Sequence, residues 1–460
     1  MCGIVGYIGN EEPQDIIIDG LKKLEYRGYD SAGVAIVDNG EIKIRKHVGA
    51  IVNLEKLIGD ERLGGHIGIG HTRWATYGSP SDVNSHPHFC EDKSIAIVHN
   101  GTIENYVELK EQLKAEGVNF ISETDTEVAA MLIGKLYKQC HDLKGALDQA
   151  VAMMEGTFAL VVVAADDPDK FVAYRKNAPL IVGKGKGCNF VASDFSALLK
   201  YTKDVYLLEN GDSVVVKADS VEIYDSEQNV CEREILHISW DVEAAEKGDY
   251  EHFMLKEIYE QPSGIKETID RSLTADGRIV PYGLELDKEA FEKCDKIVIV
   301  ACGTAYHAGL VGRQIIEKIA KIPVEIDVAS EFRYRDPFVD DRTLLIAISQ
   351  SGETADTLEA LREAKKKGAR CLSIVNVVGS SVARESDDVF YTWAGPEISV
   401  ASTKAYTTQL VCLYLLALYF ADLKGVIDKD YYDSIVKELC AVPEKIEKVL
   451  EEREKIQVLA

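Results

Sequence analysis

Short apolar runs separated by turn residues dominate the first half of the chain. Such runs predict strands, and turn signals at Asn39-Gly40, Asp166–Asp169 and Asn210-Gly211 separate them. Stretches with apolar residues at helical spacing predict helices among the strands. The predicted strands cover residues 4–8, 34–37, 68–75, 95–99, 158–164, 171–174 and 205–208, and the predicted helices cover 14–24, 103–116, 124–137 and 143–154. This mixture predicts a layered α+β domain over residues 1–225.

The second half of the chain alternates strand and helix patterns. The alternation predicts an α/β domain at 285–425, with a parallel sheet covered by helices on both faces and ligands at the carboxyl ends of its strands. The pattern over residues 226–284 predicts a partly helical connector, and the pattern over residues 426–460 predicts a further helical segment. The predicted strands are 297–301, 324–328, 343–348, 371–376 and 389–392, and the predicted helices are 306–319, 356–367 and 381–386.

Composition and charge narrow the class of protein. Among 460 residues, 46% are apolar and 28% are charged, which is typical of globular domains. A net charge of −25 disfavours nucleic acid and anionic membranes as partners. Ten cysteines without a CxxC pair indicate reduced thiols and a cytoplasmic protein. The apolar run 410–421 is too short to span a bilayer and predicts a buried or interface helix.

Cys2 is a candidate nucleophile because of its position. The initiator methionine is normally removed before a small residue, so the mature chain is expected to begin with Cys2. Its α-amine would titrate near pH 8 and its thiol near 8.5, so the amine could accept the thiol proton. Nucleophile and base would then belong to one residue. By itself, a cysteine at position 2 is more often an ordinary strand residue.

Five motifs change that interpretation. Together they resemble the glutamine amidotransferases with an N-terminal cysteine, which implies an N-terminal-nucleophile fold with αββα layers and glutamine as a substrate. The motifs are Met1-Cys2-Gly3-Ile4-Val5-Gly6, Leu24-Glu25-Tyr26-Arg27-Gly28-Tyr29-Asp30-Ser31-Ala32-Gly33, Gly70-His71-Thr72-Arg73-Trp74-Ala75-Thr76, Val98-His99-Asn100-Gly101-Thr102-Ile103-Glu104-Asn105 and Ser122-Glu123-Thr124-Asp125-Thr126-Glu127.

The resemblance implies a role for individual residues. Attack on the glutamine amide builds negative charge on its carbonyl oxygen, and the Asn100 side chain and the Gly101 N–H would stabilise that charge. Arg73 would pair with the α-carboxylate of glutamine, with Thr76 beside it, and Asp125 would face the α-ammonium group. Outside these motifs, Arg73 would be interpreted as a surface charge and Asp125 as a helix N-terminal carboxylate.

Trp74, Tyr77 and the segment His86-Pro87-His88 each need a separate interpretation. Trp74 would gate an ammonia passage by resemblance, and a core aromatic is an equally good interpretation. Tyr77 stands where the family commonly has histidine, so we expect the contacts around Tyr77 to differ from those in the family. His86-Pro87-His88 could be imagined as a metal site, but spacing places no third ligand, and we interpret it as a loop of the glutaminase domain. No metal site is therefore predicted.

Two strand-to-helix loops in the second domain are rich in hydroxyl groups. A phosphate there would meet hydroxyls, backbone N–H groups and the positive end of a helix. Serines and threonines can also simply cap helices. With the 400–404 segment, the loops resemble the sugar isomerase (SIS) domain. The resulting candidates for sugar-phosphate binding are Cys302, Gly303, Thr304, Ser349, Gln350, Ser351, Thr354, Val400 and Ser402. Neither GxGxxG nor GxxxxGK[ST] occurs, and no cofactor is predicted.

An amidotransferase domain followed by an SIS domain resembles the glucosamine-6-phosphate synthase family, the isomerizing glutamine–fructose-6-phosphate aminotransferases. That resemblance implies fructose 6-phosphate as the second substrate, an internal path for ammonia and a homodimer when full length. The family carries a second SIS domain that has no counterpart in this chain, so we expect a fragment. Such a fragment would hydrolyse glutamine, bind sugar phosphate weakly and make no amino sugar.

Two alternatives remain open at this stage. One is another amidotransferase, such as the phosphoribosylpyrophosphate enzyme, but its acidic phosphoribosyl loop followed by Arg-Gly-Thr-Thr is not found. The other is a sugar-phosphate-binding regulator without catalysis. The intact front motifs, Cys2 included, argue against a regulator.

Overall fold

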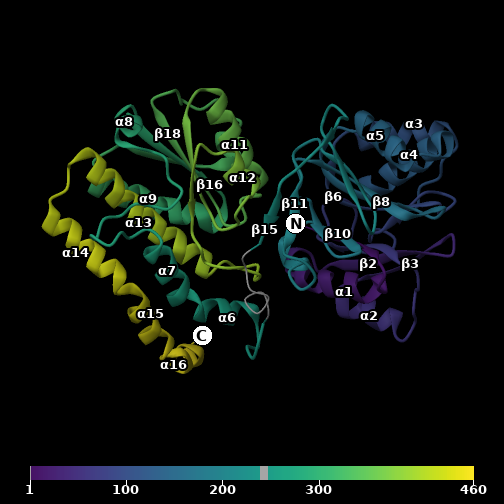
Figure 1. The fold of residues 1–460 in the computed structure, drawn as a ribbon, viewed down its shortest axis with the longest axis horizontal. Helices are drawn as coiled ribbons and strands as arrows, with labels where there is room; N and C mark the ends of the chain where they lie inside the picture. The colour runs from purple at the N-terminus through teal and green to yellow at the C-terminus, as the bar shows by residue number, and fades with distance from the viewer. Residues whose placement is uncertain (1, 239–246, 460) are drawn as a thin grey trace. The chain divides into compact units, whose positions relative to one another are not determined.

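Two compact units make up the chain. The computed structural model describes residues 2–238 and 247–459. The first unit spans Met1–Val242 and the second spans Glu243–Ala460. In Figure 1 the first unit runs from purple to teal and the second from teal to yellow.

Two antiparallel sheets form the centre of the first unit. In the described residues, the larger sheet has the strand order β15-β11-β9-β10-β1-β4-β2-β3, and the smaller has the order β14-β13-β12-β8-β7-β6-β5. The strands of the larger sheet are β1 (Gly3–Gly9), β2 (Ser31–Asp38), β3 (Glu41–Val48), β4 (Ile67–Arg73), β9 (Ile181–Lys184), β10 (Cys188–Ala192), β11 (Asp204–Leu207) and β15 (Ile235–His237). Those of the smaller are β5 (His88–Phe89), β6 (Ile95–Ile103), β7 (Gly156–Ala164), β8 (Asp167–Lys176), β12 (Ser213–Val216), β13 (Val221–Tyr224) and β14 (Val230–Cys231).

The two sheets pack on each other, and helices cover their outer faces. Apolar side chains from both sheets, such as Ile69 and Val161, form one buried cluster. Ile17 of α1 fits against Gly70 of β4, where a Cβ atom would come within 2.3 Å of it. The helices are α1 (Pro13–Leu24), α2 (Ile51–Ile58), α3 (Tyr106–Ala115), α4 (Asp125–Cys140) and α5 (Leu143–Met153), with short 3₁₀ helices η1 (Glu25–Arg27) and η2 (Phe195–Ala197). A second cluster joins α3, α4 and α5 to β6 and β7, so the predicted αββα layering is confirmed.

The register of the larger sheet places Cys2. Strand β1 pairs antiparallel with β4, and Gly3 lies opposite Thr72. Cys2, just before β1, therefore lies beside the residues that follow β4. Gly3 allows this close approach, because a Cβ there would be 2.6 Å from Thr72 Oγ1.

A parallel sheet forms the centre of the second unit, as predicted. Its strand order in the described residues is β17-β16-β18-β19-β20. The strands are β16 (Lys296–Ala301), β17 (Val324–Val328), β18 (Thr343–Ser349), β19 (Arg370–Val375) and β20 (Asp388–Tyr391). Apolar clusters on both faces bury the sheet under helices. The helices are α6 (Phe253–Tyr259), α7 (Gln261–Asp270), α8 (Lys288–Glu292), α9 (Gly303–Ala320), α10 (Ala329–Phe332), α11 (Ala355–Lys366), α12 (Ser381–Glu385), α13 (Lys404–Lys424), α14 (Lys429–Cys440), α15 (Val442–Leu450) and α16 (Arg453–Leu459).

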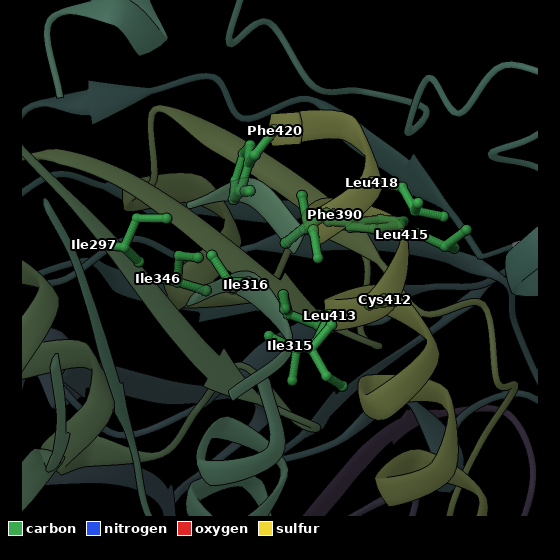
Figure 2. Close-up of a cluster of buried hydrophobic side chains, with 14 of the residues drawn as sticks. Ile297, Ile315, Ile316, Ile346, Phe390, Cys412, Leu413, Leu415, Leu418 and Phe420 are labelled. Atoms are coloured by element: carbon green, nitrogen blue, oxygen red, sulfur yellow. The ribbon is translucent and has the colours of Figure 1, made fainter. Parts of the chain in front are cut away.

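Helix α13 is the main core helix of this unit. Figure 2 shows Leu413, Leu415 and Phe420 of α13 among side chains from the sheet and from α9. The helix is longer than the apolar run predicted at 410–421, and by length and composition alone it could cross a membrane. Because most of its apolar side chains are buried inside the unit, the prediction of a buried helix is confirmed.

The structure also contains elements that the pattern did not predict. Strand β3 was missed because its positions alternate between charged and half-buried residues at a sheet edge. The expected turn at 166–169 is wrong in part, since β8 already begins at Asp167. Within the 226–284 range, β14 and β15 pair with first-unit strands, whereas α6 and α7 belong to the second unit. The domain limits at 225, 284 and 425 remain predictions.

Candidate functional site

Cys2 and Asn100 meet although 98 positions separate them. The Trp74 N–H lies 3.3 Å from Cys2 Sγ, and the thiol lies 3.5 Å from the Trp74 carbonyl oxygen. Asn100, at the end of β6, donates from Nδ2 to the Cys2 carbonyl at 3.0 Å. Burial raises the pKa of the Cys2 thiol, and the Trp74 N–H opposes that effect. A thiol in this place needs a proton acceptor before it can attack.

Gly101 follows Asn100 in a conformation that favours glycine. Its φ is +120°, and a Cβ atom would lie 2.0 Å from the Thr157 carbonyl oxygen on β7. A side chain here would force the two strands apart, so the backbone beside Asn100 depends on glycine.

Arg73 ends β4 with a donor that the chain leaves unused. Its side chain is buried, and Nη2 donates to the Gly78 carbonyl at 3.2 Å and to that of Tyr77. The buried Nη1 has no hydrogen-bond partner within the described residues. An unpartnered guanidinium N–H is costly in a protein interior unless a ligand accepts from it, and a carboxylate is its best acceptor.

Asp125 begins α4 and is also buried. Its Oδ2 accepts from the Ile103 N–H at 2.9 Å, which ties the end of β6 to the start of α4. Oδ1 lies 3.9 Å from His99 Nδ1. The carboxylate therefore lies close in space to the Asn100 segment, and its Oδ1 accepts a long bond of 3.4 Å from the Thr126 hydroxyl.

The remaining predicted residues of the first unit lie at its surface. The Thr76 side chain is exposed, and Trp74 is 44% exposed with its ring edge toward Tyr29, 5.3 Å between centroids. The Tyr77 ring packs against the Tyr106 ring, with 5.2 Å between centroids. The structure thus brings together Cys2, Trp74 and Asn100, and leaves Thr76 outside that contact.

The hydroxyl-rich loop of the second unit has a defined internal geometry. Ser349 Oγ accepts from the Gly352 N–H at 3.0 Å and lies 2.9 Å from Thr354 Oγ1. The Glu353 N–H donates to Ser351 Oγ at 3.2 Å. Thr354 precedes α11 and makes no side-chain capping bond, so the first N–H groups of that helix stay open to a ligand.

The other predicted sugar-phosphate residues flank this loop or follow in the chain. Strands β16 and β18 are neighbours with Ala301 opposite Ile348, so Cys302, Gly303 and Thr304 begin at the same sheet edge. Gln350 is half-buried in the loop. Val400 is 70% exposed in the segment before α13.

Two carboxylates, the half-buried Glu397 and the buried Glu257, anchor that segment, and the sequence did not predict them. Glu397 accepts from Ser402 Oγ at 3.0 Å and from the Thr403 N–H at 2.8 Å. Glu257 of α6, almost fully buried, accepts from the Ile398 N–H at 2.5 Å. None of these bonds joins the segment to the 349–354 loop. Glu257 lies 141 positions from Ile398 in the sequence, which is why no local motif indicates this contact.

Comparisons with known proteins agree with both halves of the chain. Residues 71–200 match a glutamine amidotransferase domain, and residues 290–419 match an SIS domain. The chain is 56% identical over 460 residues to the glutamine–fructose-6-phosphate aminotransferase (isomerizing) of Clostridium tetani, covering 100% of this chain and 75% of that protein.

The chain belongs to the isomerizing glutamine–fructose-6-phosphate aminotransferase family.

A further relative and one solved structure are also similar to this chain. The Thermus thermophilus aminotransferase is 50% identical over 453 residues, covering 98% of this chain and 74% of that protein. A solved C-terminal domain of the Francisella tularensis enzyme is 46% identical over 46% of this chain and 60% of its own, with a TM-score of 0.45. The predicted resemblance to an aminotransferase with an N-terminal-nucleophile domain and an SIS domain is confirmed.

A stack of buried histidines is the main feature that sequence reasoning missed in this family member. His86 stacks on His71 with ring centroids 4.1 Å apart and lies near His88 and His99. Among the described residues, no cluster of histidine, cysteine or acidic side chains is arranged to hold a metal ion. Four of the ten histidines fall between positions 71 and 99, and this crowding was the available signal.

Acid should destabilise this region through the histidines. Burial lowers the pKa of His71 to about 3 and also lowers those of His86, His88 and His99. Below the unfolded value near 6.5, the unfolded chain binds protons that the folded chain does not, so stability falls as pH falls. Each histidine can remove up to about 1.4 kcal/mol per pH unit.

The measurement is hydrogen exchange of peptides covering β4 and β6 between pH 6.5 and 5.5, corrected for intrinsic exchange rates. We expect protection to decrease toward the lower pH, and less steeply in His86→Phe. An exposed control, His66→Phe, should keep the wild-type slope. If protection falls equally steeply with pH in all three proteins, the buried histidines do not cause the acid sensitivity.

Proposed function

We propose that the chain releases ammonia from glutamine at Cys2 and that its second unit binds fructose 6-phosphate as the acceptor. Hydrolysis alone would give glutamate and ammonia, and transfer of the ammonia to fructose 6-phosphate would give glucosamine 6-phosphate. Family membership supports the proposal, since the relatives are named for these two substrates. The observation that carries it is the meeting of Cys2, the Trp74 backbone and the Asn100 amide.

The reaction at Cys2 can be written from this chain's own groups. With Met1 removed, the α-amine takes the thiol proton, and the sulfur attacks the amide carbon of glutamine. Asn100 Nδ2–H and Gly101 N–H donate to the resulting oxyanion. The C–N bond breaks, the nitrogen leaves as ammonia with the transferred proton, and water hydrolyses the thioester to glutamate. The raised pKa of the thiol explains why a nearby base is needed.

The glutamine main chain would be held by Arg73, Asp125 and Thr76. Arg73 offers its unpartnered Nη1 to the α-carboxylate, and Asp125 offers negative charge to the α-ammonium group. Trp74, exposed next to the nucleophile, would gate the departing ammonia.

Replacing Arg73 with lysine should raise the KM for glutamine about 10- to 100-fold and change kcat only a few-fold. Lysine keeps the charge but loses the forked donor that fits a carboxylate. Steady-state kinetics with glutamine would measure this, and Arg62→Lys on the exposed surface is the matched control. An unchanged KM in Arg73→Lys would show that another group binds the α-carboxylate.

In the second unit, the open end of α11 and the hydroxyls of Ser349, Ser351 and Thr354 would receive the phosphate. Gln350, Cys302, Gly303 and Thr304 would line the sugar from the same sheet edge. Val400 and Ser402 would close the site, held in place by Glu397.

We also infer a cytoplasmic protein that forms a homodimer and does not act on nucleic acid or membranes. Free thiols at all ten cysteines and the net charge of −25 support this.

The proposal is tested by incubating the purified chain with glutamine, with and without fructose 6-phosphate. Glutamate and ammonia should form in both cases. Absence of glutamate release would contradict the proposal. Assay of glucosamine 6-phosphate in the same reaction shows whether transfer to fructose 6-phosphate follows or hydrolysis occurs alone.

A further inference from the structure

His71 lies directly behind the Asn100 side chain. It projects from β4 and is fully buried. Its Nε2 is 2.9 Å from the His99 carbonyl oxygen and 3.0 Å from Asn100 Oδ1. A carbonyl oxygen can only accept a hydrogen bond, so Nε2 must carry a proton. The contact with His99 therefore fixes the tautomer of the imidazole.

This tautomer determines which way the Asn100 amide points. Because Nε2–H is a donor, the group facing it must be the amide oxygen. The amide nitrogen then faces Cys2, where Nδ2 donates to the carbonyl at 3.0 Å. Turning the amide over would set its NH₂ against Nε2–H and its oxygen against the Cys2 carbonyl oxygen, so a donor would face a donor and an acceptor would face an acceptor in a buried place.

Packing holds the imidazole in this position. The His71 ring lies on His86, with an angle of 23° between the planes. The His86 Nδ1 in turn accepts from the His99 N–H at 3.4 Å, so the stack is tied to the same strand that carries Asn100. The donor on His71 and the acceptor on Asn100 are thereby held at fixed places.

We propose that His71 is a positioning residue for glutamine hydrolysis: it orients the Asn100 amide so that its N–H groups face the reacting carbonyl oxygen. This inference rests on the proposed function, in which Asn100 stabilises the oxyanion. It assigns the histidine no contact with glutamine, so its loss should lower kcat without changing the KM.

The test compares five variants of the full chain by kcat and KM for glutamine. His71→Leu removes the donor and should lower kcat about 10- to 30-fold, with KM within about three-fold of wild type. His71→Gln carries an N–H that can reach the place of Nε2 and should recover kcat to within about three-fold. When His71→Leu is added to Asn100→Ala, kcat should fall by less than about two-fold further, because no Asn100 amide remains to be oriented. His66→Leu, on the surface, is the control.

Three outcomes would overturn the inference. The first is that His71→Leu lowers kcat by the same factor with and without Asn100. The second is that His71→Gln has as low a kcat as His71→Leu at equal thermal stability. The third is that kcat in His71→Leu is unchanged. If His71→Leu does not fold, His71→Asn replaces it, since its shorter amide cannot reach the place of Nε2. Cys2→Ala separates the two proposals. If Cys2→Ala still hydrolyses glutamine, the proposed function is refuted. If Cys2→Ala is inactive and His71→Leu is fully active, only the inference about His71 is refuted.

Discussion

Replacing Cys2 with alanine is expected to lower glutamine hydrolysis by about 10⁴-fold or more. The sulfur is the only atom of the residue that can form the thioester, and alanine leaves the α-amine without a partner to deprotonate. Because Cys2 precedes β1 and is not part of the packed core, the substitution should leave folding intact. Glutamate release, followed over hours at high enzyme concentration, is the measurement.

A surface cysteine supplies the control for this experiment. Cys140→Ala, at an exposed thiol, should keep wild-type activity. Hydrolysis in Cys2→Ala above about 1% of wild type, after exclusion of contaminating glutaminase, would refute the nucleophile assignment.

Replacing Asn100 with alanine is expected to lower kcat about 10²- to 10³-fold and to change the KM for glutamine little. The side-chain N–H stabilises charge that exists only after attack, so its loss acts on the transition state rather than on substrate binding. The substitution also takes one acceptor from His71, but the His99 carbonyl remains to receive that N–H.

Asn10→Ala, at an exposed position after β1, is the matched control and should behave as wild type. Equal circular dichroism and thermal midpoints would show that Asn100→Ala is folded. A folded Asn100→Ala with kcat within about three-fold of wild type would mean that the oxyanion is stabilised elsewhere.

The sequence predicts most of the layered architecture but not its edges. Buried runs such as 158–164 and 343–348 are continuous and apolar, so their strands could be predicted directly. Strand β3 could not, because its pattern is charged and half-exposed. The pairing order of strands depends on contacts between segments that are distant in sequence, and no local pattern contains that information.

The candidate site, too, could be predicted from the sequence only in part. The motifs indicate Cys2, Arg73 and Asn100 as chemical groups, but only the fold shows that the Asn100 amide reaches Cys2. His71 and Glu257 were missed because their roles come from buried partners on other elements. The crowding of four histidines between positions 71 and 99 marks the region but does not show what His71 contacts, and no neighbouring residues indicate the role of Glu257.

The central claim is that Cys2 attacks glutamine with its own α-amine as the proton acceptor. Its most direct test treats the purified protein with one equivalent of a glutamine analogue that carries a diazoketone in place of the amide, followed by intact-mass and peptide mass spectrometry. We predict a single adduct on Cys2, in chains that begin at Cys2, together with complete loss of glutamine hydrolysis. An adduct on another cysteine, or full activity in chains that retain Met1 or an acylated amine, would contradict the account.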